Sequence, residues 1–89
     1  MNAIMITTNG KRIDISPKNG KYFLQEEIYD TLNCKFFEII HLNDGSYMIY
    51  DDDGEFNRKE CNKIATSMCD NAHIRLKERI FGDIILIFN

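Results

Sequence analysis

The sequence lacks an excess of positive charge, a long hydrophobic run and a glycine-rich loop. Its 11 Lys and Arg residues are outnumbered by 14 Asp and Glu residues, which gives a net charge of −3. This balance argues against a nucleic-acid-binding protein that relies on a broad basic face. No stretch approaches the roughly 20 apolar residues that a membrane-spanning helix needs. The five glycines stand singly at predicted turns, so no phosphate-binding loop is expected.

Cysteine is scarce, and its count is odd. The sequence has three cysteines, and residues 1–8 have neither a basic n-region nor a long apolar h-region. We therefore expect a cytoplasmic protein without a signal peptide, in which the cysteines are thiols or metal ligands rather than a disulfide framework. Catalytic patterns are also missing, because His41 has no serine or cysteine partner in a nucleophile motif and no acid–base pair can be assigned. We expect a protein that is not an enzyme.

The length and the apolar content set the size of the fold. With 89 residues, of which 44% are hydrophobic, the chain is expected to form one domain over residues 1–89 with a modest core. A domain of this size buries only about 60–65% of the surface that its unfolded chain exposes. Its stability should therefore be marginal without a staple or a partner.

The first third of the chain predicts a hairpin followed by a helix. Residues 3–7 form a short apolar run that is typical of a buried strand. Residues 12–16 alternate between apolar and polar, so Ile13 and Ile15 are expected to face inward. Over residues 21–33 the apolar positions follow helical spacing, which predicts the first helix.

A second hairpin and a second helix come next. Residues 35–42 are rich in aromatic and β-branched residues and predict a central strand. The turn Asn43-Asp44-Gly45 leads back into a strand over residues 46–50. A helix is expected from about residue 57 to residue 68, and residues 83–88 predict a last buried strand.

The predicted elements follow in the order ββαββαβ. Ile74 and Leu76 belong to either a short strand or an irregular segment. We expect an α+β fold in which a single mixed or antiparallel sheet of about five strands carries both helices on one face. The last strand is expected either at an exposed edge that invites a dimer or under the first hairpin, so the chain is a monomer or a homodimer.

The best candidates for chemistry are three cysteines and a histidine. Zinc in structural sites favours a closed tetrahedron of thiolate and imidazole ligands. If the helix continued, Cys69 and His73 would share one face at i and i+4, and Cys61 lies about two turns before Cys69. The sequence therefore predicts a structural zinc site made of Cys61, Cys69 and His73, with Cys34 as a fourth ligand. In the alternative interpretation, Cys61 and Cys69 are small core residues and His73 is a surface residue.

An acidic segment stands at residues 51–55, Asp-Asp-Asp-Gly-Glu. Its spacing does not fit a calcium-binding EF-hand loop. A solvated acidic turn is the simpler interpretation, but the clustered charge can also contact a basic partner protein. Two more acids stand near the start of the first predicted helix. The predicted partner-binding residues are Glu26, Glu27, Asp51, Asp52, Asp53 and Glu55.

Six short motifs are spread over most of the chain. They are Leu24-Gln25-Glu26, Phe37-Glu38-Ile39-Ile40, Asp44-Gly45, Asp52-Asp53-Gly54, Asn62-Lys63-Ile64-Ala65-Thr66 and Gly82-Asp83-Ile84-Ile85. Together they resemble a family of small, functionally unassigned domains found in phages and mobile elements of low-GC Gram-positive bacteria. Members of that family usually carry a glycine near position 34 and lack the cysteine–histidine group. This difference fits either a metal site added to a common scaffold or sequence drift.

The composition and the resemblance lead to one main hypothesis and two alternatives. The main hypothesis is a phage or mobile-element inhibitor of a host protein, namely an anti-CRISPR protein that acts on Cas9. Because Cas9 holds nucleic acid in positively charged channels, an acidic domain can block DNA binding or loading without touching nucleic acid itself. The first alternative is a small-molecule module, such as a sponge for a nucleotide signal, with contacts from Tyr22, Tyr29 and Arg58. The second is a structural or regulatory accessory protein of a mobile element.

Overall fold

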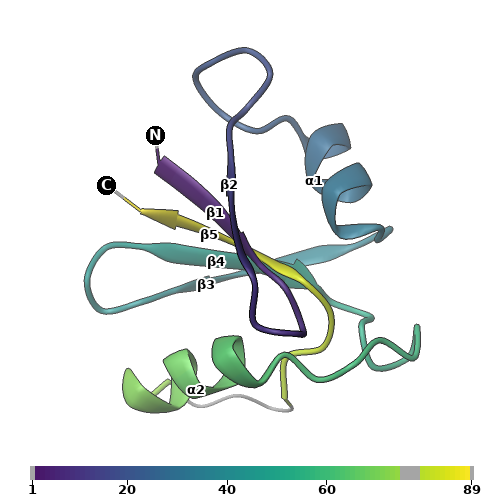
Figure 1. Ribbon diagram of the computed structural model, residues 1–89, viewed down its shortest axis with the longest axis vertical. Coiled ribbons are helices and arrows are strands. Elements are labelled where there is room, and N and C mark those ends of the chain that lie inside the picture. Colours follow the sequence, from purple (N-terminus) through teal and green to yellow (C-terminus); the bar gives the residue numbers. More distant parts are fainter. Residues whose placement is uncertain (1, 75–78, 89) are drawn as a thin grey trace.

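A computed structural model describes residues 2–74 and 79–88, in which five antiparallel strands form one sheet with two helices (Figure 1). The elements are β1 (Asn2–Ile6), β2 (Arg12–Ile15), α1 (Gln25–Leu32), β3 (Phe37–His41), β4 (Tyr47–Asp51), α2 (Lys63–Asn71) and β5 (Ile84–Phe88). The predicted α+β class, the single sheet and the order ββαββαβ are confirmed. Within the described ranges, neither helix has the length and hydrophobicity to cross a membrane.

The strand order in the sheet is β2-β1-β5-β4-β3. The last strand, β5, lies at the centre and pairs with β1 and β4. Of the two positions expected for it, the one covered by the first hairpin is correct and the exposed edge is not. The strand β3 was expected to be central and instead forms one edge of the sheet. An aromatic and β-branched composition indicates a strand, but the position of that strand depends on pairing across the whole chain.

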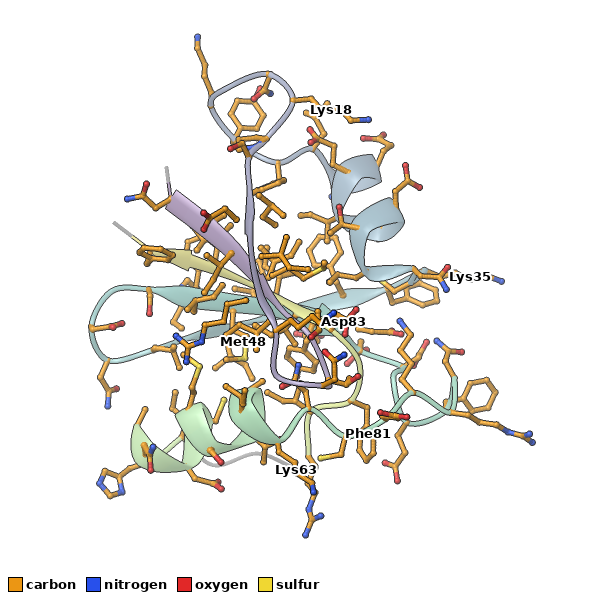
Figure 2. The ribbon with its side chains drawn as sticks, in the orientation of Figure 1. Lys18, Lys35, Met48, Lys63, Phe81 and Asp83 are labelled. Carbon is orange, nitrogen blue, oxygen red and sulfur yellow. The ribbon has the colours of Figure 1, made fainter. Side chains whose placement is uncertain are left out.

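The two helices cover opposite faces of the sheet, so the prediction of both helices on one face is wrong (Figure 1). Successive side chains of a strand point to opposite faces. Accordingly, Ile85 packs in one core with Leu32 of α1, and its neighbour Ile84 packs in another core with Cys69 of α2. Figure 2 shows Met48 on the side of the sheet that faces α2. The uninterrupted apolar run of β5 is the sequence signal of a strand that is buried on both faces.

The helix α1 begins at Gln25, four residues later than the prediction. The side chain of Asn19 holds the preceding loop, because its Oδ1 accepts hydrogen bonds from the N–H groups of Lys21 and Tyr22 at 2.9 and 3.0 Å. The side chain of Glu27 reaches back to the N–H of Leu24 at 3.3 Å. These local bonds define a turn where apolar spacing alone predicts helix.

The helix α2 begins at Lys63 rather than near residue 57, because Asn62 is its N-cap. The Oδ1 atom of Asn62 accepts a hydrogen bond from the N–H of Ala65 at 3.1 Å. The Nδ2 atom donates to the carbonyl oxygens of Ile6 and Gly82, each at 3.0 Å. Asn62 is fully buried, so one side chain starts the helix and joins it to the β1 and β5 ends of the sheet.

Two further expectations concern apolar side chains outside the helices. Ile13 was expected to face inward, but it is 41% exposed because β2 is an edge strand. Ile74 follows α2 without regular structure and packs against the core on the α2 side of the sheet. The expectation for Leu76 falls outside the described residues.

Candidate interaction surface

The acidic turn, which we define as residues 51–59, is built on a buried ion pair. The carboxylate of Asp51 has no exposed surface, and its Oδ2 lies 2.8 Å from Lys59 Nζ. Its other oxygen, Oδ1, accepts a hydrogen bond from the N–H of Asp53 at 2.9 Å, and Asn57 Nδ2 donates to Oδ2 at 3.1 Å. Asp51 therefore connects the first, middle and last parts of the turn.

The same lysine attaches the acidic turn to α1. Lys59 Nζ donates to the carbonyl oxygen of Leu32 at 2.7 Å and to that of Asn33 at 2.9 Å. The last carbonyl groups of a helix lack partners within the helix and carry partial negative charge, so an ammonium group is favoured there. Lys59 thus neutralises the Asp51 carboxylate and donates hydrogen bonds to the carbonyl groups at the end of α1.

The surroundings of Asp51 keep its carboxyl group ionised. Burial by itself raises the pKa of this carboxyl. The hydrogen bonds from Lys59, Asp53 and Asn57, together with the charge of Lys59, outweigh burial and hold the pKa below its ordinary value. Because Asp51 is buried, it supports the turn from within and does not present its carboxylate to a partner. Partner contact stays a prediction for Asp52, Asp53 and Glu55.

The backbone of the acidic turn is ordered by its own hydrogen bonds. The N–H of Asn57 donates to the carbonyl of Asp53 at 2.8 Å, and the N–H of Lys59 donates to that of Gly54 at 3.0 Å. Gly54 is buried against Phe81, where an added Cβ would lie 2.6 Å from the Phe81 carbonyl oxygen. The turn is therefore seated on the segment that precedes β5, and only a residue without a side chain fits at that point.

Two aromatic rings are exposed at the acidic turn. Phe56 is 86% exposed, and Phe36, which precedes β3, is 61% exposed. Both line a depression of about 580 Å³, and Phe56 also borders a second depression of about 320 Å³. The lining of the second depression includes the carboxylates Asp52, Asp53 and Glu55. Apolar rings and negative charges thus share one surface.

The exposure of Phe36 and Phe56 was not predicted from the sequence. Their signal is the position of Phe56 among turn-forming and charged residues, where no strand or helix pattern would bury it. Phe36 falls within the strand predicted over residues 35–42, but it precedes β3 and its side chain is exposed. Neither exposure could be read from the apolar content of the chain.

The other predicted contact residues lie elsewhere. Glu26 is exposed, whereas Glu27 is half-buried and accepts a hydrogen bond from the N–H of Lys18 at 3.1 Å. Both stand in the first turn of α1, but Lys59 attaches the acidic turn to the last turn of that helix. A helix of eight residues is roughly 12 Å long. The two groups of predicted acidic residues therefore flank opposite ends of α1.

The four predicted zinc ligands occupy separate environments. Cys34 follows α1 and packs against the core on that side, whereas Cys69 is buried in the core on the α2 side. Cys61 forms an isolated bridge with Phe81. His73 is exposed and lies beyond the end of α2 with a φ of 57°, so it does not continue the helical face of Cys69. Among the described residues, no three His, Cys, Asp or Glu side chains form a group that could hold a metal ion. Zinc stays a prediction.

Two of the thiols are poorly suited to nucleophilic chemistry. Burial raises the pKa of Cys34, and the charge of Asp51 adds to this effect against the opposing charge of Lys59. Burial and the charge of Asp70 raise the pKa of Cys69. Because the thiolate is the reactive form, neither group is activated.

The acidic turn and the adjacent Phe36 expose two kinds of groups that are common in protein interfaces. Exposed aromatic rings supply apolar contact area, and the carboxylates beside them supply charge complementarity to a basic surface. No protein-family model, curated protein or solved structure matches the chain. The role of this surface therefore rests on its own geometry and composition.

Proposed function

We propose that the protein is a non-enzymatic binding protein of a phage or mobile element, and that it inhibits a host defence protein in the host cytoplasm. We further propose that the target is Cas9. The observation that carries the proposal is the exposed ring of Phe56, which stands beside three carboxylates on a turn fixed by the Asp51–Lys59 ion pair.

The aromatic part of the surface accounts for affinity. Large aromatic side chains that enter a pocket of the partner supply much of the binding energy at protein interfaces. The backbone of an ordered turn has lost conformational freedom before binding, so less entropy is lost when the complex forms. The hydrogen bonds within residues 51–59 and the attachment of Lys59 to α1 provide this order.

The acidic part of the surface accounts for the choice of target. Asp52, Asp53 and Glu55 place negative charge beside Phe56, and the whole chain carries a net charge of −3. Cas9 holds its guide–target duplex in a positively charged channel. An acidic domain that occupies this channel excludes DNA by competition and needs no contact with nucleic acid of its own.

The nucleotide-binding alternative has less support. The ring of Tyr29 packs against Phe37, with 5.4 Å between the ring centroids, and is thereby engaged within the fold. The 580 Å³ depression is lined by Lys35 and Lys59 but by none of the residues proposed for a nucleotide, Tyr22, Tyr29 and Arg58. A small-molecule site would have to use other side chains.

A binding experiment with purified components tests the proposal. Cas9 with and without guide RNA is immobilised, and the binding of the wild-type protein is measured by interferometry over a series of salt concentrations. Phe56→Ala is expected to weaken binding at least about 30-fold, as for an interface hot spot. The triple variant Asp52→Asn, Asp53→Asn, Glu55→Gln is expected to weaken binding and to flatten its salt dependence.

Matched controls separate the surface from general effects. Ile13→Ala removes an exposed apolar side chain from β2, and Asp14→Asn removes an exposed charge from the same strand. Both variants should bind as tightly as the wild type. Absence of binding to both forms of Cas9 would reject the target. Tight binding that neither Phe56→Ala nor the triple variant weakens would reject the surface.

A further inference from the structure

The strand β3 presents one free edge of the sheet. At its two ends, the N–H of Asp52 donates to the carbonyl of Phe36 at 3.1 Å, and the N–H of Leu42 donates to that of Ser46 at 2.8 Å. Antiparallel strands bond to their neighbour through alternate residues. The N–H and C=O groups of Glu38 and Ile40 therefore point toward β4, as those of Phe36 and Leu42 do. The N–H and C=O groups of the intervening residues, Phe37, Ile39 and His41, point away from β4.

The other edge of the sheet, β2, is built differently. It is only four residues long, carries Arg12 and Asp14, and is followed closely by Pro17. Short length, charge and proline are the features that protect an edge strand from pairing. In contrast, β3 is five residues long, has Glu38 but no lysine, arginine or proline, and its central residue Ile39 is 44% exposed. No strand or helix of the described chain pairs with its outer side.

We propose that β3 pairs antiparallel with β3 of a second copy of this chain, with Ile39 opposite Ile39 at the two-fold axis. The outward groups of Ile39 then exchange hydrogen bonds with their counterparts, and the two sheets join into one. This pairing uses the same surface on both copies, as a closed two-fold dimer requires. It pairs backbone groups that point away from β4.

The side chains of β3 fit this register. Pairing about Ile39 sets the half-exposed Phe37 of one copy opposite His41 of the other, and the 61% exposed Phe36 opposite Leu42. On one face, two Ile39 side chains meet, and on the other, Glu38 stands opposite Ile40. Aromatic and aliphatic cross-strand pairs stabilise a sheet, and like charges directly opposite each other destabilise it. The register contains no such like-charge pair.

The charges beyond the ends of β3 also match. Lys35 precedes the strand and extends away from the body of the molecule (Figure 2). Asp44 lies in the turn that follows β3, and hydrogen bonds from Ser46 lower the pKa of its carboxyl. An antiparallel copy brings the end of β3 that carries Lys35 to the end of the partner strand that carries Asp44, so the two ends of the interface have opposite charge. This complementarity favours a second copy over an unrelated strand as the occupant.

The mass of the full chain in solution tests the dimer. Sedimentation or light scattering over a wide concentration series should give about twice the 10.4 kDa chain mass for the wild type at high concentration. Ile39→Lys places two like charges opposite each other at the two-fold axis, so this variant should have the mass of one chain. Ile39→Pro removes an outward N–H group and leaves the bonds to β4 in place, and it should also be monomeric.

Ile13→Lys is the matched control, because Ile13 is 41% exposed on the opposite edge strand. It should keep the wild-type mass, and circular dichroism should show that all variants are folded. A wild type that stays monomeric throughout the series would overturn the proposal. A dimer that survives both changes at Ile39, or one that Ile13→Lys also dissociates, would overturn it as well. The mass is measured without Cas9, and every variant keeps residues 51–59, which carry the proposed contact with Cas9. Failure of the dimer and failure of Cas9 binding can therefore be told apart.

Discussion

Asp51 and Lys59 form an ion pair that closes the base of the acidic turn, with 2.8 Å between Oδ2 and Nζ. The pair joins the end of β4 to the end of α1, because Lys59 also binds the carbonyl oxygens of Leu32 and Asn33. The loop that carries Phe56 is therefore held by this ion pair and by backbone hydrogen bonds of its own rather than by a helix or a strand.

Replacement of Lys59 by Met should destabilise the protein by about 3 kcal/mol, because it leaves the buried Asp51 carboxylate and two helix carbonyl groups without their cation. This value is the low end for a broken buried pair, since the Lys59 side chain keeps 19% exposure. Urea unfolding of both proteins measures the difference. Lys63→Met, at an exposed position of α2, should change the stability little. Equal stability of Lys59→Met and wild type would contradict the assigned role.

Acid should weaken the fold through Asp51. Its pKa is lowered in the folded state, so its contribution to the free energy of unfolding is fully present above the unfolded value of about 4. The contribution is lost as the pH falls through the lower, folded pKa. Unfolding free energies measured from neutral to acidic pH should decrease below about pH 5. Asp51→Asn should be less stable at neutral pH and should show a shallower decrease, whereas an unchanged slope would contradict the prediction.

Asn62→Ala should destabilise the protein by about 2–3 kcal/mol, because it removes the N-cap of α2 and the amide donor to two buried carbonyl oxygens. Those oxygens belong to Ile6 and Gly82. The control is Asn71→Ala, an exposed position in the last turn of α2. Thermal and urea unfolding of the two variants should differ clearly. Similar losses in both would mean that the buried amide has no special role.

The predicted zinc site can be tested by the metal content of the purified protein. Protein purified without added metal should contain about one zinc per chain, and chelation should lower its thermal stability. In the described fold, Cys69 is buried and His73 lies outside α2, so binding would require the end of this helix to rearrange. Zinc well below one per chain, with no effect of a chelator, would reject the site.

The sequence predicted the elements that depend on local chemistry. The hairpin around Asp44 and Gly45 was found because this turn needs residues that adopt it readily, and the strands near it were found from their composition. The bounds of α1 and α2 were less accurate. Hydrogen bonds of Glu27 with Leu24 and of Asn62 with Ala65 mark where these helices begin, and apolar periodicity does not report them.

The candidate surface was predicted in part. The acidic residues beside Gly54 stood out as clustered charge, and clustering is visible in one dimension. The sequence did not show that Asp51 is buried while Asp52 is exposed. This difference depends on the ion pair with Lys59, which is eight residues away in the chain. The exposure of Phe36 and Phe56 was also missed, since apolar residues are usually buried and only the packed fold shows which remain outside.

By itself, the sequence determined the class of fold, the order of its elements and the acidic character of one turn, because periodicity, turn residues and charge act over a few neighbouring positions. Only the tertiary structure decided that β5 lies at the centre, that α1 and α2 cover opposite faces and that β3 is an edge strand of the described sheet. These features depend on which distant segments bury each other's apolar surface most completely. The pairing of β1 with β5, the first and last strands of the chain, is the clearest case.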